Sequence, residues 1–545
     1  MSAIPAMSGA VGFSDVNLLV TTDVHSFISS HLHNDGLCGS SRCDADFGTL
    51  VSFIERVREK ADAARKDVFV FDNGDVVDGT GLSTATKVDG SAVLPLLSSI
   101  PYDALNCGNH ELYQSTTVLD GLLGKNSSGT GPSFVDFWKG NYLTSNILLA
   151  GSNGSPIGAR YTTLTGKHGT RLLVMGWMYE MPDHCPAVNI TPIATAVKEK
   201  WFEKAMEEAK QSDAIVVLAH MHYVDPLVYT LLSAIRSHVG PNYPVQFLTG
   251  HSHIREWKQL DAHAASFEAG NYGDTVGFAA FNTASTRHNA NLTTFDHQFL
   301  YMTRKTLADA AGLKVSTLDT ANGKALSSRI AGVNAAFGLS KVLGCAARTY
   351  TTHAEYGSAD SLWSLYMDAV APSTIFVPSR NTSQWFITST GALRYDLYKG
   401  NVSVDDVDMA LPFADPLYVV QRVHGTELLK ALASLNNDQA LVEEEEDDDA
   451  LGGSRYRPTR SRESPLSLPR YVATPTKLTD EKYYDAIVGR FDKENVAKAI
   501  STAAGRQVEV LTYDESSVAH GGKPPASDTE AWKNWAASLP QPPCA

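Results

Sequence analysis

The sequence of 545 residues has no apolar run long enough to cross a lipid bilayer, which takes about 20 consecutive apolar residues. It also has no excess of basic residues, because 45 Lys and Arg stand against 60 Asp and Glu and the formal net charge is -15. Proteins that bind nucleic-acid backbones normally concentrate positive charge on one face. We therefore expect neither a transmembrane segment nor a nucleic-acid partner.

Cysteine is scarce as well, with six residues and no Cys-x-x-Cys pair, which argues against a structural zinc site. Cys38 and Cys43 lie in one short segment, so a disulfide between them is possible. The N-terminal residues lack the basic and apolar regions of a signal peptide, so either the chain is trimmed or the protein does not take that route.

Asn-x-Ser/Thr sequons are present in spite of this N-terminus. They favour a glycoprotein that is secreted or lies in the vacuolar or endomembrane lumen. The sequons are at Asn126, Asn153, Asn189, Asn291, Asn381 and Asn401.

The chain is too long for a single hydrophobic core, so at least two domains are expected. Strand-like and helical stretches alternate over residues 15–300, which is typical of an α/β unit. A helical linker is expected over 301–340 and a second domain over 341–545. From about 437 to 475, an acidic tract, prolines and serines replace apolar residues and predict a disordered insertion.

Five apolar, strand-like runs in the first half are each followed by Asp, Asn or His. In an α/β sheet, ligands bind at the carboxyl ends of the strands, so these residues are candidates for one site. The runs lead, in chain order, to Asp23 and His25, to Asp75, to Asn109, His110 and Glu111, to His220 and His222, and to His251 and His253.

The order of these blocks (Asp-x-His, Gly-Asp, Gly-Asn-His-Glu, an isolated His and Gly-His-x-His) resembles that of the calcineurin-like metallophosphoesterases. The resemblance implies an α/β fold, with an N-terminal metallophosphoesterase β-sandwich flanked by helices. It also implies two divalent metal ions, Zn, Mn, Fe or Co, about 3.5–4 Å apart. Asp75 would bridge the ions. The remaining ligands would be Asp23, His25 and His253 for one ion and Asn109, His220 and His251 for the other.

The resemblance also implies roles for the residues next to these ligands. His110 matches the catalytic histidine, which would contact the phosphoryl oxygen or protonate the leaving group, and Asp75 is assigned to catalysis with it. Glu111 is expected to orient a neighbour. His222 is a rival of His220 for the metal, and the family pattern favours His220.

The second half resembles the α+β nucleotide-binding domain of the 5'-nucleotidase branch, in a pattern most similar to fungal-type members. The glycine-rich loop of that branch corresponds to Ser389–Arg394, and its Pro-Phe element ends at Phe413. Arg394 and Phe413 are therefore the substrate-binding candidates, with a surface salt bridge and a core aromatic as the respective alternatives. Ser389 and Ala392 replace the usual Asn and Gly, and a late Gly-Gly-Asp-Gly element is absent, so the nucleotide specificity stays open.

These observations predict a metal-dependent hydrolase of small phosphate esters, foremost a 5'-nucleotidase-like phosphomonoesterase that uses a metal-bridging hydroxide. A phosphodiesterase of cyclic nucleotides or nucleotide sugars is the alternative within the class. A non-catalytic binding scaffold is the alternative from another class. Loss of a metal ligand would favour the scaffold, and every ligand of the pattern is present.

Overall fold

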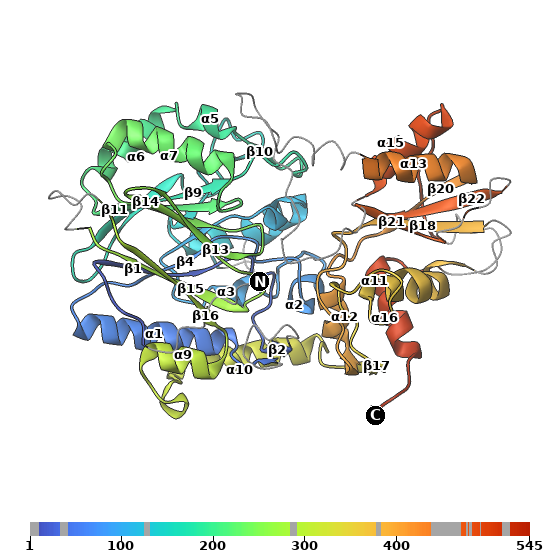
Figure 1. The fold of residues 1–545 in the computed structure, drawn as a ribbon, viewed down its shortest axis with the longest axis horizontal. Coiled ribbons are helices and arrows are strands. Elements are labelled where there is room, and N and C mark those ends of the chain that lie inside the picture. The colour runs from blue at the N-terminus through green and yellow to red at the C-terminus, as the bar shows by residue number, and fades with distance from the viewer. Residues whose placement is uncertain are drawn as a thin grey trace. The chain divides into compact units, whose positions relative to one another are not determined.

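The computed structural model describes residues 10–544 except 33–41, 125–130, 284–291, 378–382, 438–469, 476–477, 479–481, 491 and 515–523. The described residues form two compact units, each with its own sheets and hydrophobic core (Figure 1). The first unit holds the chain up to Asp78 and Ala85–Ala336, and the second holds Gly79–Thr84 and the chain from Phe337.

Two six-stranded sheets pack face to face in the first unit, with strand orders β16-β15-β1-β4-β5-β6 and β13-β14-β12-β11-β9-β8. The first sheet consists of β1 (Val16–Thr21), β4 (Phe69–Asp72), β5 (Ala104–Asn106), β6 (Tyr142–Leu143), β15 (Thr275–Phe281) and β16 (Phe295–Tyr301). The second consists of β8 (Tyr161–Thr165), β9 (Arg171–Met178), β11 (Ala214–His220), β12 (Val245–Thr249), β13 (Arg255–Asp261) and β14 (Ala264–Ala269).

The central strands of both sheets are parallel: β1, β4, β5 and β6 in one, and β9, β11, β12 and β14 in the other. Parallel strands in such folds are covered on both faces and read as continuous apolar runs, as in Ala214–His220. Leu18, Phe71, Val216 and Leu248 belong to the core cluster between the sheets. The predicted sandwich is confirmed.

Helices cover the outer face of each sheet (Figure 1). The helices are α1 (Phe47–Ala63), α9 (Arg304–Ala311) and α10 (Ala321–Ala336) on the first sheet, and α5 (Ile193–Ala196), α6 (Lys200–Ala209) and α7 (Pro226–Val239) on the second. The α1 and α10 backbones approach so closely that a Cβ on Gly48 would lie 2.3 Å from the Gly323 carbonyl oxygen. The segment expected to be a helical linker therefore packs as part of the first unit up to Ala336.

Shorter elements complete the first unit. They are β2 (His31–Leu32), β3 (Arg42–Cys43), β7 (Ile147–Leu149), β10 (Val188–Ile190), α3 (Leu94–Leu97), α4 (Phe134–Phe137), the 3-10 helices η1 (His110–Leu112) and η3 (Val315–Thr317), and the π-helix η2 (Thr117–Leu122).

The second unit is a mixed five-stranded sheet, in the order β21-β18-β22-β20-β23, with helices on both faces (Figure 1). Its strands are β18 (Ser383–Ser389), β20 (Leu417–His424), β21 (Tyr471–Thr474), β22 (Tyr483–Gly489) and β23 (Leu511–Thr512), with β17 (Val342–Ala346) and β19 (Gly400–Ser403) in a separate pair. Its helices are α2 (Gly81–Thr84), α11 (Leu362–Leu365), η4 (Tyr366–Ile375), α12 (Val404–Ala410), α13 (Gly425–Asn437), α15 (Lys493–Ala504) and α16 (Asp528–Ser538).

One face of this sheet packs on α13 and α15, through residues such as Leu428 and Ile500. The other face packs on η4 and α16, through residues such as Tyr366 and Trp532. The predicted α+β architecture of the second half is confirmed.

The C-terminal limit of the predicted insertion is wrong. Tyr471–Thr474 form β21, which is buried and pairs with β18 in antiparallel register. This short β-favouring run lies beside a long polar segment, and averaging the composition across both obscured it. Residues 438–469 of the predicted insertion lie outside the described residues.

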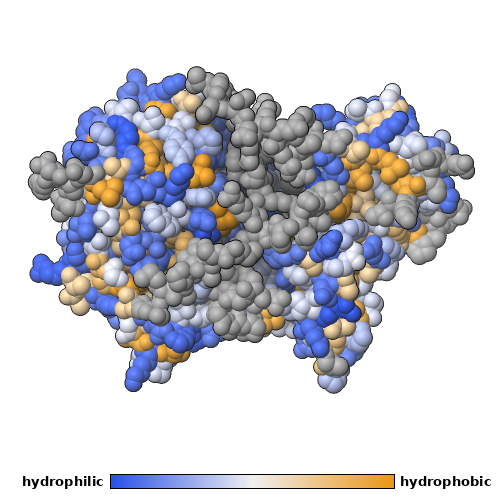
Figure 2. All heavy atoms as spheres, viewed as in Figure 1, coloured by the Kyte–Doolittle hydropathy of each residue, from blue (hydrophilic) through white to orange (hydrophobic). Residues whose placement is uncertain are grey.

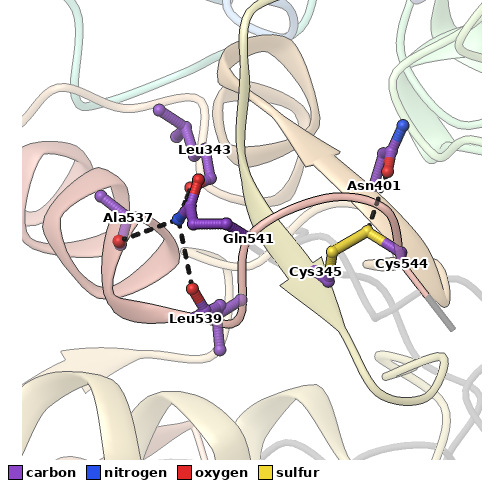
Figure 3. The surroundings of a disulfide bond; sticks show 7 residues. All are labelled: Leu343, Cys345, Asn401, Ala537, Leu539, Gln541 and Cys544. Carbon is purple, nitrogen blue, oxygen red and sulfur yellow. Dashed lines mark hydrogen bonds between the residues drawn. A yellow bond between two sulfur atoms is a disulfide. The ribbon is translucent and has the colours of Figure 1, made fainter.

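A disulfide joins Cys345 in β17 to Cys544, 199 residues later in the chain (Figure 3). Beside it, the Gln541 side chain donates hydrogen bonds to the carbonyl oxygens of Leu343 and Leu539, at 3.0 and 3.2 Å. These contacts hold the C-terminal segment against β17. Cys43 is also disulfide-bonded, but Cys38 lies outside the described residues, so the Cys38–Cys43 pairing stays a prediction.

On the face shown in Figure 2, hydrophilic residues are interspersed with scattered apolar ones. Across the described ranges, no helix is both long enough and apolar enough to span a membrane. Three sequon asparagines, Asn153, Asn189 and Asn401, are exposed, and the other three lie outside the described residues. Glycosylation stays a prediction.

Candidate metal centre

The carboxyl ends of parallel strands in both sheets bring the predicted site residues together. Asp23 and His25 follow β1, Asp75 follows β4, Asn109 and His110 follow β5, His220 ends β11, and His251 and His253 follow β12. Among the predicted site residues, three groups of side chains each have their potential ligand atoms within 4.8 Å of one another. The groups are Asp23–His25–His253, His25–Asp75–His110 and Asp75–His220–His251.

Asp75 belongs to two of these groups, which is the position that a shared ligand would occupy. The amide oxygen of Asn109 lies 3.0 Å from Nε2 of His220, at the edge of the group that contains both His220 and His251. All seven predicted ligands are thus gathered in one place. His222 belongs to none of the three groups and is half-buried, so the geometry favours His220 over its rival.

The backbone is strained where these side chains are presented. Asp23, His25, Asp75, His251 and His253 have φ angles of 51°, 46°, 55°, 77° and 59°. Non-glycine residues in this left-handed region cost roughly 1–2 kcal/mol each and persist where the surrounding contacts fix them. Such strain is concentrated at functional sites, and here it directs five side chains toward one another.

Two glycines allow the loops after β4 and β5 to touch. Gly74 has a φ of +89°, and a Cβ built on it would lie 2.3 Å from the backbone nitrogen of Gly108. A Cβ on Gly108 would lie 2.2 Å from the backbone nitrogen of Asp75. The glycine of the Gly-Asp block and that of the Gly-Asn-His-Glu block are therefore required by the same close approach.

Backbone carbonyl groups fix the rings of two histidines. Nδ1 of His25 lies 3.0 and 2.9 Å from the carbonyl oxygens of Val77 and Asp78, so it carries the proton and donates to them. Nδ1 of His220 donates in the same way to the carbonyl oxygen of Asn73, at 2.8 Å. In the neutral ring, Nε2 then keeps its lone pair, which is the form that binds metals.

These Nε2 atoms face other electron-rich atoms. Nε2 of His25 lies 3.2 Å from Nε2 of His253 and 3.7 Å from a carboxylate oxygen of Asp75. Nε2 of His220 lies 3.1 Å from a carboxylate oxygen of Asp75. Converging lone pairs repel one another unless a proton or a metal cation lies between them, so the arrangement fits divalent cations.

The pKa shifts follow from burial and from the two carboxylates. Burial lowers the pKa of His220, but the carboxylates of Asp75 and Asp23 outweigh it and raise the pKa to about 10. Burial raises the pKa of Asp75, whereas His220 and His110 hold it well below its usual range. Burial lowers the pKa of His251 to about 3, so this ring is neutral. Its Nε2 is buried and has no hydrogen-bond partner among the described residues, which suits a metal ligand.

Glu111 holds the loop that carries Asp75. One carboxylate oxygen accepts hydrogen bonds from the backbone N–H groups of Asp75 and Gly108, at 3.0 and 2.7 Å. The other accepts from Val76 and Val77, at 2.7 and 3.2 Å. Burial and the nearby charge of Asp75 raise the pKa of Glu111 to about 7. Glu111 therefore connects the loops after β4 and β5, in agreement with its expected orienting role.

Glu268 in β14 holds a ligand loop of the second sheet, as Glu111 does for the first. The sequence analysis did not identify this residue. It accepts hydrogen bonds from the backbone N–H groups of Ser252 and Ile254, at 3.1 and 3.3 Å, and from the Ser252 hydroxyl at 2.8 Å. These residues flank His253, so Glu268 fixes the loop that presents it. The available signal was a single charged residue inside an otherwise apolar strand.

Asp78 was also missed, although it follows Asp75 by three residues. Its carboxylate lies 2.9 Å from Nδ1 of His110, and its backbone carbonyl oxygen accepts the hydrogen bond from His25. Its own φ is +58°. One strained residue therefore orients both a candidate ligand and the candidate catalytic histidine.

In the second unit, the structure places the two substrate-binding candidates next to each other. The Arg394 guanidinium lies over the Phe413 ring, 5.2 Å from its centroid. Nε of Arg394 is buried and has no hydrogen-bond partner among the described residues. Their contact with a substrate stays a prediction.

Comparison with known proteins identifies the family. Residues 16–255 match the family model described as calcineurin-like phosphoesterase, and residues 349–487 match the one described as NAD nucleotidase, C-terminal domain. Residues 16–255 therefore form a calcineurin-like phosphoesterase domain. Its second half is a C-terminal domain of the 5'-nucleotidase type, as the resemblance predicted.

Proteins that are similar to most of this chain include three from fungi. An uncharacterised protein of Schizosaccharomyces pombe is 29% identical over 74% of this chain and 69% of its own. A secreted protein of Arthroderma benhamiae is 25% identical over 79% of this chain and 69% of its own. The crystal structure of a Candida albicans 5'-nucleotidase, 21% identical, covers 97% of this chain and 99% of its own with a TM-score of 0.78, which shows a shared fold.

The approach between the loops after β4 and β5 of this phosphoesterase is testable through Gly74. We expect Gly74→Ala to lower the free energy of unfolding of the first unit by about 2–5 kcal/mol, since it adds a steric clash to an unfavourable φ. Urea denaturation followed by tryptophan fluorescence measures the change.

Gly140→Ala is the matched control, because Gly140 has a φ of +91° but nothing within 4 Å of its added Cβ. We expect its free energy of unfolding to fall by only about 1–2 kcal/mol, which is the cost of the left-handed φ angle for a non-glycine residue. Equal losses in the two variants would contradict a tight contact between the loops.

Proposed function

We propose that this protein is a 5'-nucleotidase-like phosphomonoesterase, with bond cleavage in the first unit and nucleotide recognition in the second. The observation that supports this most is the buried cluster centred on Asp75, which belongs to one group of close side chains with His220 and His251 and to another with His25 and His110. No residue of the predicted ligand set lies elsewhere. This completeness argues against the alternative of a non-catalytic scaffold.

We assign Asp75 as the ligand shared by two divalent ions. The other proposed ligands are Asp23, His25 and His253 for one ion and Asn109, His220 and His251 for the other. When bound, such a pair of ions supplies an activated water nucleophile and neutralises charge on the phosphoryl oxygens. Nitrogen and oxygen ligands without thiolate are compatible with Zn, Mn, Fe or Co.

The role proposed for His110 is to act on the ester itself. The Asp78 carboxylate holds Nδ1 at 2.9 Å, and the His110 backbone N–H donates to Asp75 at 2.8 Å. With Nδ1 occupied, Nε2 is the atom that serves the substrate. As an imidazolium, the ring would stabilise the phosphoryl oxygens and give its Nε2 proton to the departing alkoxide.

Two contacts in the second unit support a role for Arg394 in substrate binding. The Asp492 carboxylate accepts a hydrogen bond from the backbone N–H of Ser389 at 2.7 Å, which fixes the start of the loop that corresponds to the branch's glycine-rich loop. The Arg394 backbone N–H donates to the carbonyl oxygen of Ala410 at 3.0 Å, which fixes its end. A guanidinium held in this way beside an aromatic ring suits an anionic group attached to a base.

One observation favours a second candidate substrate. The model that matches the C-terminal part is that of the NAD nucleotidases, so a dinucleotide or a nucleotide sugar is the alternative to a nucleoside monophosphate. A panel of nucleoside monophosphates, nucleotide sugars, NAD and cyclic nucleotides, assayed for phosphate release and by chromatography, separates monoesterase from diesterase activity.

We further propose that the protein works in an extracellular or lumenal compartment. The Cys345–Cys544 disulfide and the bonded state of Cys43 fit an oxidising environment. The similarity to a secreted fungal protein points in the same direction.

The metal assignment predicts about two divalent ions per chain and loss of activity on chelation. Asp75→Asn should lose both metal and activity, because one carboxylate serves both ions. Elemental analysis and nucleotide hydrolysis measure the two properties. Asp120→Asn, at an exposed carboxylate, is the control and should keep both. An active wild-type protein that contains no metal would refute the assignment.

The role of His110 predicts a different phenotype. His110→Ala should retain its metal but lose about 10²–10⁴-fold in kcat, the usual range for a positioned acid–base group. His222→Ala is the control, since His222 lies in none of the ligand groups, and its kcat should stay close to that of the wild type. Steady-state kinetics of metal-loaded variants would show normal turnover of His110→Ala if the assignment were wrong.

The role of Arg394 predicts a loss that depends on the substrate. Arg394→Ala should weaken kcat/KM for the best nucleotide by about 1–3 kcal/mol, typical of a lost charge-assisted contact. p-Nitrophenyl phosphate, which has no nucleoside to bind, should be cleaved almost as before. Arg348→Ala, at an exposed arginine of the same unit, should alter neither. Equal losses on both substrates would assign Arg394 to folding.

A further inference from the structure

Tyr113 follows η1 directly and touches two site residues. Its hydroxyl oxygen accepts a hydrogen bond from Nδ2 of Asn109 at 3.0 Å. Its ring packs edge-to-face against that of His110, with centroids 5.1 Å apart. Tyr113 therefore contacts both members of the Asn-His pair that the loop after β5 presents.

Tyr179 approaches the same place from the end of β9. Its ring stacks on that of His251, with centroids 4.4 Å apart and planes at 29°. Its backbone N–H donates to the carbonyl oxygen of His220 at 3.3 Å. Its hydroxyl is hydrogen-bonded to Tyr113, and burial raises its pKa well above the usual range, so the phenol keeps its proton.

The two tyrosines together span three loops, those after β5, β9 and β12. The residues they contact, Asn109, His220 and His251, are the three assigned to one ion besides the shared Asp75. In the other half of the site, the Tyr272 ring packs edge-to-face on the rings of His25 and His253, its backbone N–H donates to the carbonyl oxygen of Asp23, and Nδ2 of Asn271 lies 3.3 Å from Nδ1 of His253. The two halves of the site are thus supported differently.

The contact with Tyr113 occupies the NH2 end of the Asn109 amide and leaves the oxygen end toward the site. In the observed orientation, Oδ1 lies 3.0 Å from Nε2 of His220 and Nδ2 lies on the tyrosine hydroxyl. A metal ion binds the amide oxygen and not the NH2 group, which has no lone pair to offer. Rotation of the amide by half a turn would present the wrong end, and the hydrogen bond to Tyr113 opposes that rotation.

We propose that Tyr113 and Tyr179 form a positioning pair that orients Asn109 and His251 and thereby sets the affinity for the metal ion that these two residues share. The inference rests on the proposed function for the existence of the ion, but it concerns binding and not turnover. Loss of such a partner behind a metal ligand typically costs about 10–100-fold in affinity.

Competition between the apo protein and a chelating dye for Mn²⁺ and for Zn²⁺ tests the pair. Tyr113→Phe keeps the ring and removes the hydroxyl, so one of the two binding steps should weaken by about 10–100-fold while the other changes little. Tyr179→Phe should weaken the same step to a smaller extent, because the bond to Asn109 remains. Tyr229→Phe, at an exposed tyrosine of α7, is the matched control and should change neither step.

The Tyr113→Phe change in an Asn109→Asp protein distinguishes a loss of amide orientation from general damage to the fold. An aspartate at position 109 presents oxygen in either orientation and needs no orienting partner. In Asn109→Asp protein, the Tyr113→Phe change should therefore have little further effect on the affinity, and the two changes should be non-additive.

Three outcomes would overturn the proposal: unchanged affinities in Tyr113→Phe, equal weakening of both steps with a lower unfolding free energy, or full additivity in the Asn109→Asp background. Wild-type protein that binds two ions but hydrolyses no phosphate ester would refute the proposed function and leave the pair intact. Failure of the wild type to bind two ions would refute both.

Discussion

The buried carboxylate of Asp75 is the group on which the rest of the site depends. Only 1% of its surface is exposed, and an unpaired charge in such a place would cost several kcal/mol. His220 at 3.1 Å and the backbone N–H of His110 at 2.8 Å compensate part of that cost. The charge that raises the pKa of His220 to about 10 is the same charge that divalent cations would neutralise. The site is therefore built to favour positive charge at its centre, whether as a proton or as metal ions.

The strain of the ligand loops is offset by two buried glutamates, one on each side of the sandwich. Glu111 accepts four backbone hydrogen bonds from the loops after β4 and β5, and Glu268 accepts two, together with one from a hydroxyl, in the loop after β12. Each carboxylate satisfies N–H groups that no sheet neighbour can reach, because the loops have left the ladder. Removal of either would leave buried donors unpaired and would release a backbone whose left-handed residues are not stable by themselves. Positions outside the candidate ligand set therefore determine the geometry of the candidate ligands.

The fold of the first unit and the convergence of the candidate ligands were predictable because each motif carries local information. An apolar run followed closely by Asp, Asn or His indicates a strand end, and the order of five such ends predicts where the site lies. Asp78 and Glu268 were missed because their function appears only when distant loops meet, and a buried glutamate in a strand has no motif around it. The Cys345–Cys544 disulfide was missed for the same reason, since 199 residues separate the two cysteines. β21 was missed because a four-residue strand, with Tyr471, Val472 and Thr474 as its β-favouring residues, is too short to change the average composition of the long polar segment next to it.

One short segment of the first half of the chain belongs to the second unit. Gly79–Thr84 belongs to the second unit, although it follows Asp78, the residue that holds His110 and His25. Within that unit the Gly81 backbone N–H donates to the Asp405 carboxylate at 2.8 Å, and a Cβ on Gly81 would lie 2.5 Å from Leu339. Asp78, which holds His110, and Gly81, which is hydrogen-bonded to Asp405, are thus three residues apart in the chain. Burial raises the pKa of Asp405 to about 7, and the hydrogen bond from Gly81 is one of the contacts that favour its charged form.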